Sequence, residues 1–115
     1  MGSAPPPSRT TRHNLAWALV YRRGPGDLDK AIDLYQTVLT DQVRVLGTDH
    51  PDTLTTRHGL AWALVYRRGQ GDLDKAIDLF QTVLTNEVRV LGTDHPDTLA
   101  TRESLTRALK ERGRA

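Results

Sequence analysis

The sequence contains no cysteine, which excludes disulfides, thiol nucleophiles and thiolate metal sites. No apolar run approaches the roughly 18 residues that a membrane-spanning helix needs. An excess of one charge is also lacking, because the formal net charge is only +2 and the basic residues are spread along the chain. Nucleic acid would be bound by a clustered basic face. We therefore expect a cytoplasmic protein that binds neither nucleic acid nor a membrane.

Residues 1–9 are distinguished only by three consecutive prolines at positions 5–7, which favour an extended chain. This stretch also lacks the basic-then-apolar order of a signal peptide. We expect a flexible Pro-rich leader or a tag remnant here, with the folded part of the chain beginning at residue 10.

The dominant feature of the sequence is an internal repeat with a period of 45 residues. Residues 11–55 and 56–100 align without a gap, and a third copy begins at residue 101 and stops after its first half. We expect repeat 1 over residues 10–55, repeat 2 over residues 56–100 and a half repeat over residues 101–115. The two full copies differ at six positions, namely Asn14/Gly59, Pro25/Gln70, Tyr35/Phe80, Asp41/Asn86, Gln42/Glu87 and Thr55/Ala100.

Each copy contains two helical patterns. Pro51 suits the first position of a helix, and Asp49 or His50 precedes it where an N-cap is needed. Gly69 is expected as the C-cap residue of that helix, and Asp72 as the N-cap of the next. Together the patterns predict helices over residues 10–23, 28–46, 51–68, 73–91 and 96–112.

The apolar residues of these helices recur at intervals of three, four and seven, which is the spacing of one helix face. A single helical hairpin cannot bury both of its apolar faces, whereas stacked copies can. Short connections between the helices require neighbours to pack antiparallel. The sequence therefore predicts an all-α fold of five helices, in which two full repeats are followed by a C-terminal helix.

The half repeat has the composition of a capping helix. Leu105 and Leu109 stay apolar, as a helix that packs on one side requires. Because the opposite side turns polar, we expect this helix to cap the stack and the chain to end here. The exchanged positions are Ala61, Trp62, Val65 and Tyr66 in repeat 2, which become Thr106, Arg107, Lys110 and Glu111.

The sequence resembles the tetratricopeptide repeat. The matching residues of repeat 2 are Leu60-Ala61 in the first helix, Gly71-Asp72-Leu73 in the turn, and Ala76, Phe80 and Val83 in the second helix. The stretch LGTDHPDT at residues 91–98 is similar to the junction of the kinesin light chain subgroup, which is also abundant in bacterial tetratricopeptide proteins. The resemblance covers the chain from about residue 11 onward. It implies a right-handed superhelical solenoid of antiparallel helix pairs that binds a protein or peptide.

Two features depart from this resemblance. The repeat is longer than is usual in the subgroup, and the extra residues fall before Ala76, where they lengthen either the first helix or the turn. The turn position that is usually aromatic is occupied by Leu28 and Leu73. A period of 45 residues also falls in the range of HEAT and armadillo repeats, but the motifs of those repeats are absent.

No group of residues in the sequence indicates catalysis, a metal or a cofactor. His50 and His95 lie 45 residues apart in matching Asp-His-Pro-Asp junctions, whereas a zinc site needs three or four converging ligands. We expect these histidines to cap and brace helix starts. The glycine-rich turns at residues 24–26 and 69–71 lack the strand, lysine and hydroxyl of a phosphate-binding loop. The chain is therefore not expected to be an enzyme, and we expect no cofactor.

The resemblance also implies a concave groove lined by the first helix of each pair, with a peptide or protein as ligand. A lining of tryptophan, tyrosine and histidine with arginine nearby suits an aromatic or acidic peptide, because aromatic and arginine side chains dominate binding hot spots. The tryptophans and tyrosines could equally form the core between repeats, and the sequence leaves both interpretations open. Carried onto this chain, the groove positions give the candidates His13, Trp17, Tyr21, His58, Trp62, Tyr66 and Arg107.

A second hypothesis is self-association. No helix precedes the first one to cover Trp17, Val20 and Tyr21, and an uncovered apolar face favours pairing. On this hypothesis we expect a homodimer or a stacked array. The missing cap on the N-terminal side also fits a fragment of a larger bacterial regulatory protein. The sequence does not identify the partner.

Overall fold

The computed structural model describes the backbone of residues 9–114 and the side chains of residues 15–114. Within this range the all-α prediction is confirmed, and each helix end lies within two residues of its predicted position. Of the expected leader, only Arg9 falls in the described range, where it begins the first helix. The five helices are α1 (Arg9–Arg22), α2 (Asp27–Leu46), α3 (Pro51–Arg67), α4 (Asp72–Leu91) and α5 (Pro96–Arg114).

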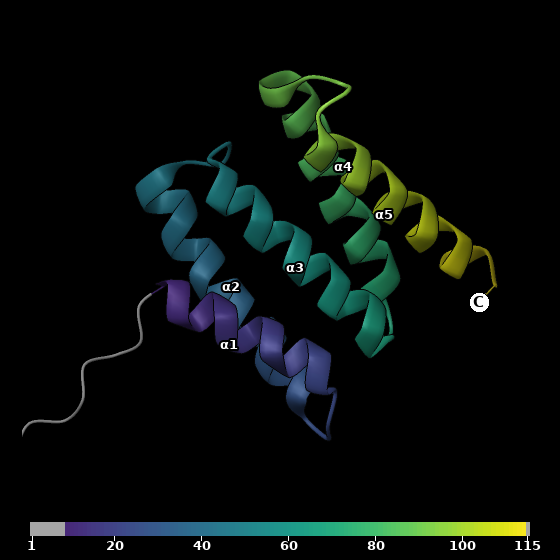
Figure 1. The fold of residues 1–115 in the computed structure, drawn as a ribbon. Helices are drawn as coiled ribbons and strands as arrows, with labels where there is room; N and C mark the ends of the chain where they lie inside the picture. Colours follow the sequence, from purple (N-terminus) through teal and green to yellow (C-terminus); the bar gives the residue numbers. More distant parts are fainter. Residues whose placement is uncertain (1–8, 115) are drawn as a thin grey trace, which may run out of the picture.

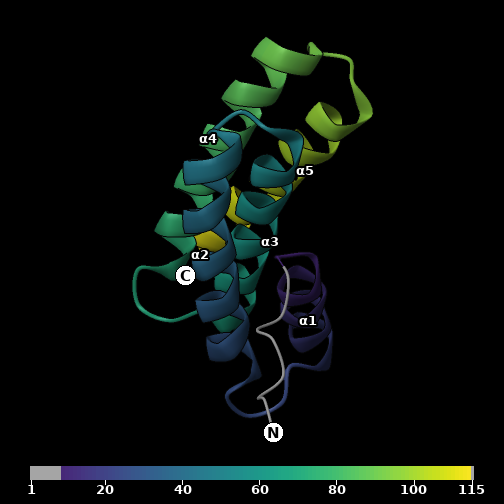
Figure 2. The same ribbon diagram turned by 90° about the vertical axis from the view of Figure 1, so that its left-hand side faces the viewer.

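The helices form two layers. α1, α3 and α5 lie in one layer, and α2 and α4 lie in the other (Figures 1 and 2). Successive helices pack against each other and run antiparallel, because each connection has only four residues. Each helix of the second layer therefore packs against its own partner and against the first helix of the next repeat, which makes the chain a helical solenoid.

An arginine–aspartate pair fixes the turn within each repeat. In repeat 2, the Arg67 guanidinium donates to both carboxylate oxygens of Asp72, at 2.7 and 2.9 Å. The Gly69 N–H donates to the same carboxylate at 2.8 Å. These donors hold the pKa of Asp72 below its ordinary value, because they favour the charged carboxylate. The same arrangement recurs in repeat 1 with Arg22, Asp27 and Gly24.

Two predictions about the ends of these helices are wrong. α3 ends at Arg67, and the residue in the left-handed conformation is Arg68 (φ 56°) rather than Gly69. Glycine is needed at position 69 because a Cβ there would lie 2.7 Å from an Asp72 carboxylate oxygen. The N-cap of α4 is Gly71 (φ 79°) and not Asp72, because Arg67 and Gly69 already bind that carboxylate.

The start of α3 agrees with prediction. Pro51 is the first residue of the helix, and His50 is its N-cap. The Asp52 N–H donates a hydrogen bond to Nδ1 of His50 at 3.1 Å. His95 accepts the same bond from the Asp97 N–H at the start of α5. The histidines of the two junctions therefore brace helix starts.

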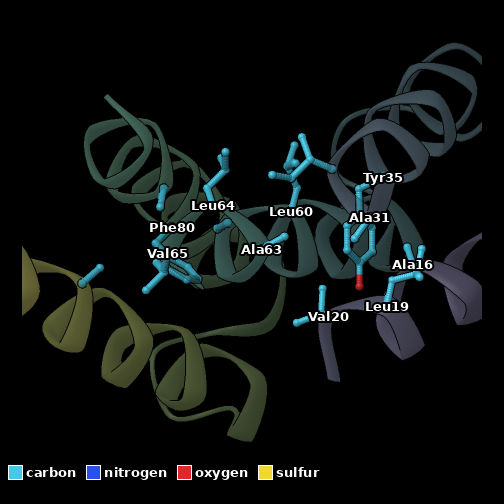
Figure 3. Packing of buried hydrophobic residues seen from close by; sticks show 14 of the residues in the cluster. Ala16, Leu19, Val20, Ala31, Tyr35, Leu60, Ala63, Leu64, Val65 and Phe80 are labelled. Carbon is cyan, nitrogen blue, oxygen red and sulfur yellow. The ribbon is translucent and has the colours of Figure 1, made fainter. Parts of the chain in front are cut away.

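The core contains two large aromatic side chains, Tyr35 of α2 and Phe80 of α4, both fully buried. Figure 3 shows the Tyr35 side chain between residues of α3 and residues of α1. A Cβ at position 59 would lie 2.8 Å from the Tyr35 ring, so Gly59 allows this ring to pack directly on the backbone of α3. In α5 the residue equivalent to Gly59 is Ser104.

Candidate functional site

Two cavities lie between α3 and α5, on the layer formed by the first helix of each pair, and we refer to them together as the groove. One of its cavities, with a volume of about 360 Å³, lies toward the C-terminal ends of these two helices. It brings together three of the predicted groove residues, Trp62, Tyr66 and Arg107. We call it the aromatic–basic cavity, and it is lined by Trp62, Val65, Tyr66, Arg68, Arg107, Lys110, Glu111 and Arg114.

Trp62 belongs both to this cavity and to the core. Its indole meets Phe80 edge to face, with ring centroids 5.5 Å apart, and stacks on Tyr66 at 5.6 Å. It is only partly buried and packs against the core cluster. The two interpretations that the sequence left open, groove and core, therefore both describe this residue.

Tyr66 is more open than Trp62, with 37% of its surface exposed. The guanidinium of Arg23, which directly follows α1, lies 4.0 Å from the centroid of the Tyr66 ring. This cation–π contact links the first repeat to α3. The Tyr66 ring is therefore contacted by both Trp62 and Arg23, and its side chain still lines the cavity.

Positive charge surrounds the aromatic pair. The Glu111 carboxylate accepts a hydrogen bond from Arg68 at 2.8 Å and lies 3.5 Å from Arg114. Arg107 pairs with Glu103 at 3.5 Å, and both side chains are about two-thirds exposed or more. Such exposed pairs contribute little stability. The lining of four basic residues and one acidic residue leaves this cavity positively charged.

A second cavity, of about 180 Å³, lies in the same groove toward the N-terminal ends of α3 and α5. It is lined by three carboxylates, one from the α2–α3 loop, one from α4 and one from α5. We call it the acidic cavity, and its lining is Asp49, Pro51, Leu54, Thr55, His58, Glu87, Val90, Leu91, Asp97, Ala100 and Thr101.

Glu87 is the most buried carboxylate of the acidic cavity, with 6% of its surface exposed. Its Oε1 is buried and has no hydrogen-bond partner among the described residues. Burial raises the pKa of Glu87, whereas a hydrogen bond with Thr101 lowers it. The nearby Asp97 raises this pKa and His95 lowers it, each to a smaller extent. Glu87 was not among the predicted site residues, although the Gln42/Glu87 difference between the copies is the sequence signal that points to it.

His58 lies between the two cavities. Its Nε2 is 3.2 Å from the hydroxyl of Ser104 in α5, and its ring meets Phe80 edge to face with centroids 5.3 Å apart. Burial lowers the pKa of His58, so the imidazole is mainly neutral at pH 7. This predicted groove residue therefore joins α3 to α5 and also lines the acidic cavity.

The candidates of the first repeat do not line these two cavities. Trp17 and Tyr21 contact each other edge to face at 5.1 Å and are 40% and 70% exposed. Val20 is only 3% exposed, so the expectation that it lies on an uncovered face is wrong. It belongs to the core cluster because α3 packs against that side of α1 (Figure 3). The side chain of His13 lies outside the described residues.

Within residues 15–114, no three histidine, aspartate or glutamate side chains converge to form a metal site. The described helices also include none with the length and apolar character needed to span a membrane. The groove brings together four of the predicted residues, namely His58, Trp62, Tyr66 and Arg107.

Comparison with known proteins agrees with the architecture. Two matching solved structures contain nearly identical tetratricopeptide-like repeats assigned to a kinesin light chain of Podosopora anserina, one of them a single-substitution variant. Each is 28% identical to this chain and covers 91% of it, with a TM-score of 0.77. The chain spans 47% of the length of those solved chains. No curated protein matches it.

The sequence profile of the tetratricopeptide repeat matches residues 9–70 and residues 62–115, so the two matches together cover every described residue. Repeats of this kind form non-catalytic scaffolds that mediate protein–protein interaction. The solved structures place the match with repeats of the kinesin light chain type. The chain therefore belongs to the tetratricopeptide repeat family.

Proposed function

We propose that the groove between α3 and α5 binds a peptide segment of a partner protein, and that acidic or aromatic side chains of this segment occupy the aromatic–basic cavity. The observation that carries the proposal is the convergence of Trp62, Tyr66 and Arg107 in one cavity, although they come from two different repeats. Tryptophan, tyrosine and arginine are the residues most enriched at binding hot spots.

The basic side chains of the cavity are available to a ligand. Among the side chains of residues 15–114, Arg107 has an exposed pair with Glu103, which a ligand carboxylate can replace at little cost. Lys110 lies one helical turn further along α5 and also lines the cavity. A carboxylate placed between these two groups would gain charge-assisted hydrogen bonds beside an aromatic surface.

The proposal is tested with a displayed library of random peptides selected on the wild-type chain. We expect the selected peptides to be enriched in acidic and aromatic residues. Their binding is then measured on the double variant Arg107→Glu, Lys110→Glu and should weaken at least tenfold, because the variant reverses two charges at exposed positions. The matched control reverses two exposed charges on the helices of the other layer, Lys30→Glu and Lys75→Glu, and should change binding less than twofold.

Selected peptides that bind both double variants equally would contradict the proposal, as would a selection that enriches no sequence. Thermal unfolding of each variant accompanies the measurement, so that a loss of binding is not confused with a loss of folding. Trp62→Ala is a weaker test, because Trp62 also packs on Phe80 and its loss disturbs the core.

Self-association through α1 is a second candidate function. It is supported by the exposure of Trp17 and Tyr21, which contact each other on α1. A charge in the centre of such a contact, introduced by Tyr21→Glu, should convert a dimer into a monomer in sedimentation velocity. A monomeric wild type at high concentration would rule this function out.

A further inference from the structure

The groove between α3 and α5 has opposite charges at its two ends. The aromatic–basic cavity has four basic side chains and one acidic one, whereas the acidic cavity has three carboxylates and no lysine or arginine in its lining. The two cavities follow one another along the same face of α3, from Thr55 through His58 and Trp62 to Tyr66. A single ligand lying along the groove would therefore meet both.

Glu87 supplies the observation that points to a ligand in the acidic cavity. A carboxylate oxygen that is buried without a hydrogen-bond partner is unfavourable, and folded proteins leave few such atoms. Glu87 Oε1 is such an atom in a residue that lines the cavity. The equivalent residue of repeat 1, Gln42, also has a buried Oε1 without a partner among the described residues, but it is neutral. The unpaired oxygen therefore recurs in both repeats, whereas the charge is specific to repeat 2.

The nearby carboxylates also favour a cation, whereas His95 opposes one because it lowers the pKa of Glu87. Asp97 lies close enough to raise the pKa of Glu87, and a bound cation would relieve this repulsion. Asp49 is partly neutralised by a salt bridge with Arg89, which does not line the cavity. The last turn of α4 contributes Val90 and Leu91, and the C-terminal end of a helix attracts cations.

The first turns of α3 and α5 oppose this attraction, since the N-terminal end of a helix carries about half a positive charge. Asp52 lies in the first turn of α3 and Asp97 in the first turn of α5, so each start already has a compensating carboxylate. The three carboxylates of the lining outweigh these partial charges, even with Asp49 partly neutralised by Arg89. The hydroxyl of Thr101 and the neutral imidazole of His58 add polar groups without adding charge.

We infer that the acidic cavity binds the guanidinium or ammonium group of a basic side chain, with Glu87 as its principal partner. The inference rests on the proposed function and specifies its ligand, which is a peptide with a basic residue at one end of the bound segment and an acidic or aromatic residue at the other. Thr55 and Tyr66 are separated by about 16 Å along α3, given a rise of about 1.5 Å per residue. This distance corresponds to about five residues of extended peptide.

The test uses a probe that needs no partner protein. N-acetyl-arginine methylamide is titrated into the ¹⁵N-labelled chain, and backbone amide shifts are followed by NMR. N-acetyl-citrulline methylamide, which has nearly the same shape without the charge, is the matched ligand. We expect saturable shifts at Thr55, His58 and Thr101 with the arginine probe, and at least fivefold weaker binding or none with citrulline.

Two variants locate the site. Glu87→Gln introduces the residue that repeat 1 already has at the equivalent position, and it should weaken binding of the arginine probe at least fivefold. Asp78→Asn removes one negative charge from an exposed position of the same helix and should change binding less than twofold. Equal binding of both probes, or an unchanged affinity in Glu87→Gln, would overturn the inference.

The result is independent of the test of the proposed function. If the arginine probe binds at Glu87 while no displayed peptide depends on Arg107 and Lys110, the acidic cavity stands and the peptide groove fails. If the displayed peptides depend on those residues and the arginine probe does not bind, the opposite holds. If both succeed, peptides selected on the wild-type chain should carry a basic residue roughly five positions from the acidic one, and Glu87→Gln should abolish that preference.

Discussion

The two junctions between repeats are built on the same backbone but are held together by different chemistry. At the first junction, α2 packs on α3, the Tyr35 ring lies against Gly59, and Arg23 covers Tyr66. At the second junction, α4 packs on α5, the Ser104 hydroxyl bonds to His58, and Arg68 bonds to Glu111. The buried polar residue is neutral in the first junction (Gln42) and acidic in the second (Glu87).

This comparison shows that near-identical copies are not interchangeable. Tyr35 requires the space above Gly59, and α5 offers Ser104 at the equivalent position. The arginine after the first helix is retained in both copies, but its partner changes from an aromatic ring to a carboxylate. Register-shifted stacking of the copies, which their sequence similarity would permit, is therefore opposed by the shapes at the junctions.

The largest loss of stability is expected when a residue of the first junction is replaced by its equivalent from the second. Gly59→Ser places a side chain where a Cβ alone would lie 2.8 Å from the Tyr35 ring, and overpacking of this kind costs about 2 kcal/mol. Chemical denaturation measures the loss in the free energy of unfolding.

A second substitution, at Tyr35, tests whether the sizes of residues 35 and 59 depend on each other. Tyr35→Phe combined with Gly59→Ser recreates the Phe80 and Ser104 combination of the second junction. We expect the double variant to be more stable than the sum of the single effects predicts, by about 1 kcal/mol, because contacting residues couple by about this amount. Strictly additive effects would show that the two positions do not constrain each other.

A smaller effect is expected from exchanging the buried polar residues. Glu87→Gln should stabilise the chain by about 1 kcal/mol at pH 7, because it removes a charge from a buried position. Gln42→Glu should destabilise it by a similar amount. Denaturant unfolding of both variants and the wild type measures the differences.

The pH dependence of this stability difference shows whether the charge of Glu87 causes it. A pKa raised in the folded state means that the folded chain binds the Glu87 proton more tightly than the unfolded chain does. The favourable contribution of the protonated Glu87 to folding stability is present at low pH and is lost as the pH rises through the folded-state pKa. The advantage of Glu87→Gln over the wild type should therefore be smallest near pH 4 and grow toward pH 7. A constant advantage at all pH values would contradict a charge effect.

The smallest effect is expected at the two arginines that follow the first helices. Arg23→Ala and Arg68→Ala should each cost about 0.5 kcal/mol, since both contacts are partly exposed. In 1 M salt the loss for Arg68→Ala should largely disappear, because its salt bridge with Glu111 is screened. The loss for Arg23→Ala should persist, because packing on the Tyr66 ring does not depend on an opposite charge. Equal salt dependence would show that the junctions are held by the same chemistry.

Much of the fold could be predicted because each local signal agreed with the others. The period of 45 residues, the helix faces and Pro51 together indicated the helices, and a histidine cap is found where it was expected. The role of Asp72 could not be predicted in this way. An aspartate before a helix is compatible with an N-cap, and only the position of Arg67 and Gly69 assigns its carboxylate to the preceding turn.

Part of the candidate site was also within reach of the sequence. The resemblance supplied Trp62, Tyr66 and Arg107, which do line one cavity. It did not supply Glu87, because helix periodicity gives the face of a helix but not the neighbours that this face meets. The Glu87 carboxylate near the end of α4 shares a cavity with Asp49 and Asp97, which come from two other segments of the chain.

By itself the sequence determined the repeat, the five helices and their antiparallel order, because these depend on contacts between residues close together in the chain. The tertiary structure decided which sides of the helices are covered and which charges meet. Val20 is buried and Tyr21 is exposed, although they are adjacent in the same helix. The opposite charges at the two ends of the groove likewise arise from residues of different repeats, which only the packing of α3, α4 and α5 brings together.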